Sequence, residues 1–275
     1  MNQIKVFLLM AAMTVFLVLL GSLMGEGMAI VFFFGAVVMN VGMYWFSGKI
    51  VLRMYKAKVV SREDAPQLYD MVDELRQRAG LPMPVVAIAP QAQPNAFATG
   101  RNHKHAVVCV TTGLLQLMDR RELEGVIAHE LAHIQHRHML VSTVAAVMAG
   151  AIALVARWGF FLGGGGENRN PVVGILVMIL APMAAIILQM AISRTNEFQA
   201  DSTAADIAGT PDGLTSALQR LESAAQRIPM DVNPAAAQLA IVNPLRGGAM
   251  GGFTKMFRTH PPTEDRIAAL RRLHG

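Results

Sequence analysis

The stretch His129-Glu130-Leu131-Ala132-His133 decides how the rest of this sequence is interpreted. It lies in a run from Arg121 to His136 that lacks proline and whose apolar residues recur close to every 3.6 positions, which predicts a helix. On a helix, His129 and His133 lie one turn apart on one face, so both imidazoles can bind one zinc ion. The carboxylate of Glu130 projects beside them, where it can take a proton from water. This is the metalloprotease arrangement; the alternative is a helix face that merely carries two histidines and an acid.

The composition is too apolar for an ordinary soluble domain. Of 275 residues, 53% are hydrophobic and only 16% are charged, and the mean hydropathy is +0.40. We therefore predict a membrane protein. The net charge of +5 is modest, and no basic stripe with interleaved aromatic residues is present, so we expect no nucleic-acid partner. The single cysteine, Cys109, excludes an intramolecular disulfide and lies in an apolar run, which favours a buried core thiol over a nucleophile.

Four apolar stretches are long enough to cross a bilayer, since each is close to the ~20 residues that a membrane core requires. Only a short Gly-Glu-Gly segment separates the first two, which predicts a transmembrane hairpin over residues 1–46. The second pair, over residues 139–192, is joined by a glycine-rich turn that ends at Pro171. The four expected spans are roughly Val6–Met24, Met28–Phe46, Met139–Phe161 and Val172–Ile192.

The hydrophilic segments 47–138 and 193–275 carry most of the 24 lysines and arginines. By the positive-inside rule, both segments and both termini are expected in the cytoplasm. Arg157 is expected to reach the membrane interface from the outer end of the third span. The basic stretch Lys49–Lys58 either touches anionic lipid headgroups or forms a plain solvated helix face.

The segment 47–138 shows the patterns of a small α+β unit. An amphipathic helix is expected over Ala65–Ala79, and short strands over Val85–Ala89, Asn95–Thr99 and Ala106–Thr111. The expected fold class is an α-helical membrane protein with about four transmembrane helices and a cytoplasmic α+β zinc metalloprotease domain of the gluzincin type. The catalytic part in 47–138 would supply the sheet and the histidine helix, and 193–275 would supply further helices.

A zinc protease needs a third protein ligand and leaves the fourth position to water. The candidate is Glu197, just after the fourth apolar stretch, and Asp201 follows four residues later on the same helix face. Asp201 could hold a ligand imidazole by its second nitrogen. A solvated helix face is the alternative. Counted along continuous helices, His133 and Glu197 would both lie within about two turns of a membrane span, hence at the same level.

Several motifs, in order along the chain, resemble those of the HtpX family of membrane-bound zinc metalloproteases, relatives of the CAAX prenyl proteases. The motifs are the N-terminal hairpin, Asn95–Gly100, Thr111–Leu115, His129–His133, Arg194–Asp201 and Thr259–Ile267. The resemblance implies one zinc ion per chain on His129, His133 and Glu197, with Glu130 as general base.

The resemblance also implies an edge strand that pairs with the backbone of the substrate, a recognition mode with its own physical sense. That strand would be Asn95-Ala96-Phe97-Ala98-Thr99-Gly100. The implied role is proteolysis of misfolded or damaged membrane proteins at the cytoplasmic face of a bacterial inner membrane, in quality control and stress response. The implied partners are membrane-protein substrates and the lipid bilayer. The alternatives are a prenyl-peptide-type protease and a non-catalytic membrane protein that binds zinc.

Three further histidines and Arg266 lie in or near these motifs. His260 precedes two prolines in a family motif and is expected either to donate to the oxyanion of the tetrahedral intermediate or to play a structural role at a helix entry. Arg266 has the same two alternatives. His136 and His138 have the wrong spacing to be ligands and are expected on the interfacial surface. The segment Arg227–Gly252 has no strong periodicity, and the sequence does not distinguish a lid from a disordered segment.

Overall fold

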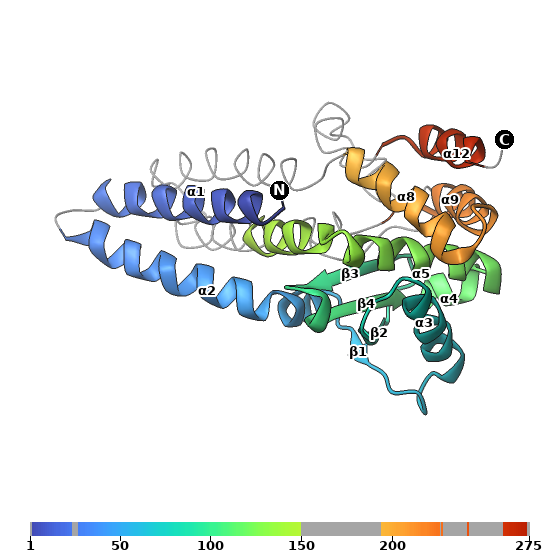
Figure 1. Ribbon diagram of the computed structural model, residues 1–275. Helices are drawn as coiled ribbons and strands as arrows, with labels where there is room; N and C mark the ends of the chain where they lie inside the picture. Colours follow the sequence, from blue (N-terminus) through green and yellow to red (C-terminus); the bar gives the residue numbers. More distant parts are fainter. Residues whose placement is uncertain are drawn as a thin grey trace.

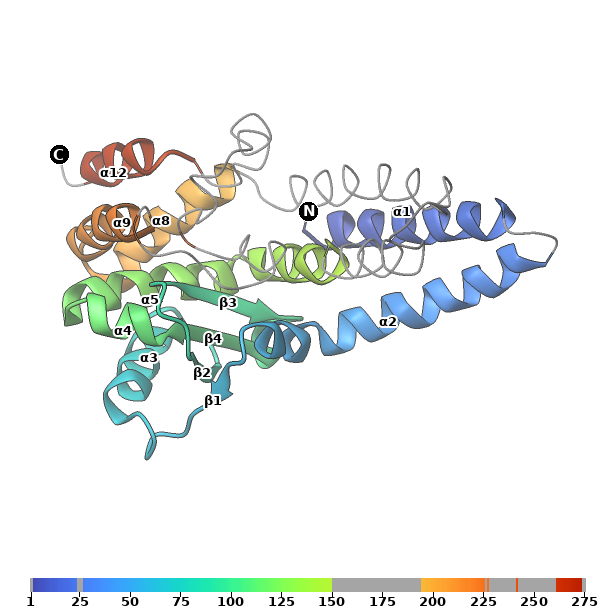
Figure 2. The same cartoon turned by 180° about the vertical axis from the view of Figure 1, so that it is seen from behind.

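The computed structural model describes residues 2–23, 27–149, 194–225, 227, 241 and 261–273. Two long helices, α1 (Asn2–Leu23) and α2 (Met28–Met54), lie side by side and extend away from the sheet (Figures 1 and 2). The buried amide of Asn40 ties them together, because it donates to the Met10 carbonyl at 3.1 Å and to Thr14 Oγ1 at 2.9 Å. Such bonds hold apolar helices together where water is scarce.

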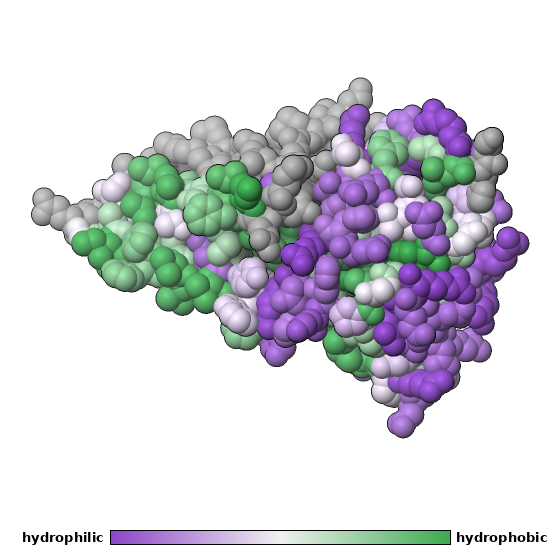
Figure 3. All heavy atoms as spheres, in the orientation of Figure 1, coloured by the Kyte–Doolittle hydropathy of each residue, from purple (hydrophilic) through white to green (hydrophobic). Residues whose placement is uncertain are grey.

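The outer surface of the helical hairpin is apolar, with exposed side chains such as Phe7, Val15, Phe34 and Val38. Within the described residues, α2 is the helix that is both long and apolar enough to cross a membrane, and Ile4–Leu19 and His138–Ala149 are shorter apolar helices. Figure 3 shows the hydrophobic surface gathered over α1 and α2 and the hydrophilic surface over the other end. The first two stretches expected to span the membrane fall on the helices α1 and α2, and α2 runs eight residues further than the expected stretch. The fourth expected span, Arg157 and the glycine-rich turn lie outside the described residues, as does most of the third span.

A mixed four-stranded sheet follows the hairpin. Its strands are β1 (Lys58–Val59), β2 (Val85–Ala89), β3 (Ala96–Gly100) and β4 (Ala106–Thr111), in the order β1-β2-β4-β3. β2 and β4 are parallel, whereas β3 is antiparallel to β4 with Ala96 opposite Val110. The expected small sheet is confirmed, with β2 and β4 as predicted and β3 shifted by one residue. β1 was not predicted.

Successive side chains of each strand point to opposite faces of the sheet, and each face packs against helices. Side chains such as Val86, Val108 and Val110 face α3 (Pro66–Arg78) and α5 (Arg120–Gln135). Side chains such as Phe97 and Cys109 face the end of α2 and the helix His138–Ala149. Cys109 is fully buried, and burial raises the pKa of its thiol to about 12, so the predicted core role is confirmed.

The helix α5 packs against the sheet and several helices, and it begins with a strong start signal. Asp119 caps it by accepting from Glu122 N at 2.9 Å, and Glu122 bonds back to Asp119 N at 3.0 Å, which is a capping box. Gly125 permits the close approach of a neighbouring helix, since an added Cβ would lie 2.3 Å from Leu214 N. Helices α8 (Arg194–Ala208) and α9 (Asp212–Ala225) pack on α5, and α12 (Thr263–Arg272) packs on both of them.

The path from α5 towards the membrane is bent. The helix ends at Gln135, and Arg137 adopts a left-handed backbone with φ 58° before a new helix starts at His138. The prediction that one continuous helix runs from His133 into the third span is therefore wrong. A short helix, α4 (Thr112–Leu117), and a 3-10 turn, η1 (His103–His105), complete the described elements.

Candidate active site

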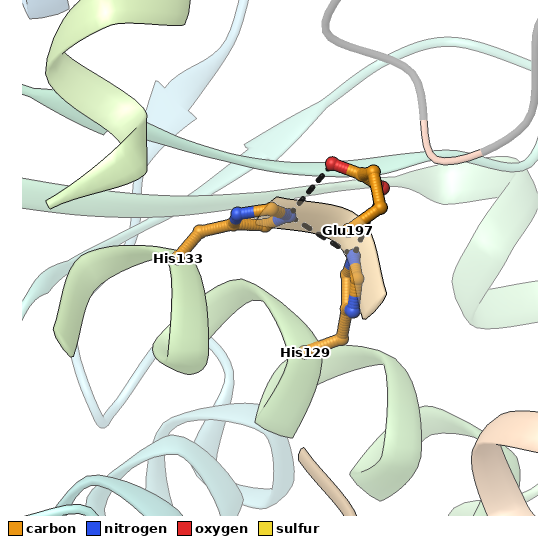
Figure 4. A group of neighbouring side chains, drawn as sticks. All are labelled: His129, His133 and Glu197. Carbon is orange, nitrogen blue, oxygen red and sulfur yellow. Dashed lines mark hydrogen bonds and ion pairs between the residues drawn. The ribbon is translucent and has the colours of Figure 1, made fainter. Parts of the chain in front are cut away.

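Three side chains from two packed helices converge on one point. His129 and His133 stand one turn apart on α5, with their Nε2 atoms 3.1 Å apart. Glu197 of α8 places Oε1 3.4 Å from His133 Nε2 and Oε2 3.8 Å from His129 Nε2. Figure 4 shows the three side chains pointing toward one another. The structure thus brings together the three residues that were predicted as metal ligands.

The spacing of these donor atoms suits a tetrahedral metal ion. Ligand atoms at ~2.0–2.1 Å from a tetrahedral zinc ion lie about 3.3 Å from one another. The Nε2–Nε2 distance of 3.1 Å and the distances of 3.4 and 3.8 Å to the two oxygens of Glu197 fall around this value. Two imidazole nitrogens and one carboxylate oxygen are also a donor set that zinc uses in catalytic sites. The residues therefore fit a metal ion with one further position open.

A buried ion pair stands behind His129. Asp201, one turn after Glu197, places Oδ1 3.0 Å from His129 Nδ1, although the ring N–H does not point straight at it. Arg266 of α12 donates to Asp201 through Nε at 2.8 Å and Nη2 at 2.7 Å. Burial alone would raise the pKa of Asp201, but Arg266 lowers it to about 2. Burial would likewise lower the pKa of Arg266, but Asp201 raises it, so both groups are charged at neutral pH.

Glu130 is held at the same site by helix geometry. It follows His129 directly on α5, and it is buried. Its charge contributes to the raised pKa of Arg266, so the two groups are near each other.

Burial differs among the three ligand candidates: the side chains of His129 and Glu197 are 1% and 5% exposed, whereas His133 is 14% exposed. His133 is therefore the least buried of the three ligand candidates.

The predicted substrate-binding segment forms the edge strand next to α5. β3 pairs with β4 along one side, packs against α5, and is buried along its whole length. Asn95, just before β3, accepts a hydrogen bond from Ile241 N at 3.1 Å, and the Ile241 carbonyl accepts one from Arg266 Nη1 at 3.2 Å. The start of β3 is therefore linked to the buried arginine of the site.

The expectation that His138 lies on the surface is wrong. His138 is 6% exposed, and its Nδ1 lies 3.2 Å from Nδ1 of His133. The left-handed turn at Arg137 brings the chain back so that residue 138 reaches His133. His136 is half-buried and contacts Thr203 Oγ1 through Nε2 at 2.9 Å. His260, the other predicted site residue, lies outside the described residues.

This fold and donor set are those of a metallopeptidase, and sequence comparison gives the family. The profile of peptidase family M48 matches residues 62–274, so the chain belongs to that family. The chain is 55% identical to a protein of Gemmatimonas aurantiaca over 99% of both chains. It is 53% identical to one of Salinibacter ruber, over 100% of this chain and 99% of the other. Both relatives are called "Protease HtpX homolog", so the resemblance to HtpX is confirmed.

A solved structure is also similar in part. The crystal structure of S. mikatae Ste24p superposes with a TM-score of 0.48 at 21% sequence identity, covering 88% of this chain and 57% of that longer chain. The family and the HtpX relatives identify a metalloendopeptidase, and the spanning-length helix α2 accords with a membrane-bound one.

Proposed function

We propose that this protein hydrolyses peptide bonds with one zinc ion, which His129, His133 and Glu197 hold. The observation that carries the proposal is the convergence of the three side chains: one potential ligand atom from each lies within 4.8 Å of the others, and the two Nε2 atoms are 3.1 Å apart. When bound there, zinc would supply a Lewis acid that polarises the scissile carbonyl and acidifies a water molecule.

Glu130 acts as the general base. It accepts a proton from the attacking water and then delivers that proton to the leaving amine. Its position directly after a ligand histidine and its burial support this role. A binding site that only held zinc would gain nothing from a buried carboxylate beside it, which argues against a non-catalytic zinc protein.

Asp201 and Arg266 act as positioning residues. Asp201 orients His129 through Nδ1, and Arg266 holds Asp201 at two points. Because the Arg266 guanidinium is already bound by Asp201 and the Ile241 carbonyl, the geometry favours its structural role over donation to the oxyanion. His260 is proposed as the oxyanion donor on the strength of its sequence motif.

The substrate is proposed to be an extended segment of a misfolded or damaged membrane protein, bound beside the edge strand of residues 95–100. Among the described strands β3 pairs with β4 alone, so its other edge has no strand partner. A substrate inserted along that edge would pair through its backbone, which depends little on its sequence and so suits varied unfolded substrates. The charge distribution supports a multi-pass protein of an inner membrane with both termini and the site in the cytoplasm. A prenyl-peptide-type protease would share this site and differ only in substrate.

One experiment tests the activity and its metal together. The protein, purified in detergent, is incubated with an unfolded membrane protein, with and without a chelator, and zinc is then added back. Cleavage that is lost with the chelator and restored by zinc supports the proposal. Cleavage that persists after complete metal removal would refute it. Parallel incubation with a prenylated peptide separates the two protease alternatives.

A further inference from the structure

Basic side chains gather where the apolar face of α2 ends. Trp45 and Phe46, at that end, are 54% and 56% exposed. Lys49 and Arg53 follow at one-turn intervals and are exposed as well. At a rise of 1.5 Å per residue, the part of α2 from Met28 to Phe46 is roughly 27 Å long, close to the ~30 Å of a hydrocarbon core. Trp45 therefore stands where aromatic side chains mark a membrane interface.

Arg101 reaches the same level from the sheet. It directly follows β3, its guanidinium carbon lies 4.4 Å from the centroid of the Trp45 ring, and its Nη1 donates to the Trp45 carbonyl at 3.3 Å. Small residues allow this approach, because a Cβ added to Gly48 of α2 would lie 3.6 Å from the Gly100 Cα. Lys104 is exposed in the same connection between β3 and β4. This connection thus packs at the interface end of α2.

These cations have no carboxylate partner within the part of the chain that the structure describes. By contrast, three arginines on α3 and just before it have carboxylate partners. The pairs are Arg62 with Asp70, Arg76 with Asp73 and Arg78 with Glu74. A cluster of unpaired cations beside an interfacial tryptophan is complementary to phosphate-bearing headgroups. We propose that Lys49, Arg53, Arg101 and Lys104 form a binding surface for the headgroups of anionic membrane lipids.

Lipid binding here would set the position of the substrate strand. β3 ends at Gly100, so a headgroup held by Arg101 fixes the end of β3 at the bilayer surface. This inference rests on the membrane placement of α2 given above but not on the chemistry of the active site. Binding and proteolysis can therefore fail independently.

Tryptophan quenching tests the surface directly. The chain has two tryptophans, so Trp158→Phe leaves Trp45 as the sole reporter. The full chain is reconstituted in phosphatidylcholine that contains brominated-chain phosphatidylglycerol or, at the same fraction, brominated-chain phosphatidylcholine. We expect stronger quenching by the anionic lipid. The measured quantity is the ratio of quenching by the anionic lipid to quenching by phosphatidylcholine. This ratio should fall several-fold in the double variant Lys49→Gln/Lys104→Gln, which keeps the contact of Arg101 with Trp45. The reason is that each cation near an anionic surface contributes roughly a five-fold preference.

A charge-matched control is Arg62→Gln/Arg78→Gln, which removes two cations from the paired surface and should leave the ratio unchanged. Equal quenching by the two lipids in the parent protein would overturn the proposal. So would an unchanged ratio in Lys49→Gln/Lys104→Gln, or an equal fall in the control, which would indicate net charge alone.

A different observation concerns the second ligand histidine. His133 turns Nε2 toward the other metal-binding atoms, so its Nδ1 faces Nδ1 of the buried His138 at 3.2 Å. An imidazole that binds a metal through Nε2 carries its proton on Nδ1 and needs an acceptor there. The buried His138 ring stacks on His136, with ring centroids 5.4 Å apart, and Gln199 Nε2 lies 3.4 Å from His136 Nδ1. His129 has Asp201 at its own Nδ1, at 3.0 Å.

Resting on the zinc site proposed above, we infer that His138 is a positioning residue that accepts the Nδ1 proton of His133 and so aims its Nε2 at the metal. Each ligand histidine then has its own partner, a carboxylate for His129 and an imidazole for His133. Removing such a partner weakens metal binding by about 10–100-fold.

Three variants test the inference: His138→Ala, His138→Asp and His136→Ala. Zinc affinity is measured by competition with a chromophoric chelator, the cobalt-substituted protein is followed by visible absorption, and the melting temperature is measured without metal. We expect His138→Ala to lose roughly 10–100-fold in affinity and to shift the cobalt spectrum. His138→Asp, which restores an acceptor, should recover most of the affinity. His136→Ala, which removes only the ring stacked on His138 and leaves the acceptor, should lose clearly less affinity than His138→Ala.

Affinity and spectrum unchanged in His138→Ala would refute the inference, as would an equal loss in His138→Asp or in His136→Ala. A loss that is matched by a lower melting temperature of the metal-free protein would assign His138 a merely structural role and refute it too. The stoichiometry of the parent protein is measured first: if it bound no zinc, the proposed function would fail before His138 was tested.

Discussion

Arg266 and Asp201 form a two-point ion pair behind the ligand candidate His129, with Arg266 Nε and Nη2 2.8 and 2.7 Å from the two carboxylate oxygens. Both side chains are almost fully buried. They come from α12 and α8, whereas His129 comes from α5. The pair therefore joins three helices that are distant in sequence at the back of the metal site. Because both charges are buried, each depends on the other to stay ionised.

The first prediction follows from this burial. Arg266→Ala leaves the Asp201 carboxylate buried without its cation, and the expected loss in the free energy of unfolding is about 3–5 kcal/mol. The control is Arg78→Ala, which breaks an exposed ion pair with Glu74 and should cost less than about 1 kcal/mol. Denaturant titration of both variants in the same detergent measures the difference. Equal losses would show that the buried pair contributes no more than a surface pair.

The second prediction concerns the general base. Glu130→Gln keeps the shape of the side chain and all three ligand candidates but removes the proton acceptor. We expect full zinc stoichiometry and a loss of proteolysis of roughly 10²–10⁴-fold, the range of general acid–base catalysis. Metal analysis of the purified variant accompanies the cleavage assay. Substantial cleavage by the zinc-loaded variant would remove Glu130 from this role.

Local patterns predicted much of the catalytic fold. The predicted strands Val85–Ala89 and Ala106–Thr111 coincide with β2 and β4, because alternation and the flanking proline and glycine residues are local signals. The strand β1 was missed because it has two residues and depends on its pairing with β2, which no local pattern encodes.

The metal-ligand candidates were predictable for a similar reason. The residues that contact them from behind, His138 and Arg266, were not. The i, i+4 spacing places His129 and His133 on one helix face, and Glu197 was identified from its place after an apolar stretch. The contact between His133 and His138 depends instead on the left-handed backbone of Arg137, a conformation that non-glycine residues rarely adopt. Nothing in the spacing of five residues indicates that contact. The role of Arg266 likewise required knowing that α12 packs against α8.

The third prediction concerns the ligand from α8. Glu197→Ala removes one of three ligand candidates, so zinc affinity should fall by well over the 10–100-fold expected for Asp201→Asn, which touches the metal only through His129. Asp206→Ala, which changes an exposed acid on the same helix, should leave the affinity unchanged. Chelator competition orders the three variants. Stoichiometric zinc with parental affinity in Glu197→Ala would place the third ligand elsewhere.

The last prediction concerns which side of the membrane the site faces. Cys109 is fully buried and burial raises the pKa of its thiol to about 12, so it should not react with thiol reagents in the folded protein. The protein without an added cysteine should therefore stay unlabelled, and it serves as the control. Single cysteines are then introduced as Gly165→Cys, between the third and fourth expected spans, and Glu63→Cys, exposed just before α3. Because the lysines and arginines concentrate in segments 47–138 and 193–275, we expect both segments in the cytoplasm. A membrane-impermeant maleimide added to intact cells should label position 165 and spare position 63, and both should react after lysis. Labelling of position 63 alone on intact cells would reverse the topology and move the site to the outer face.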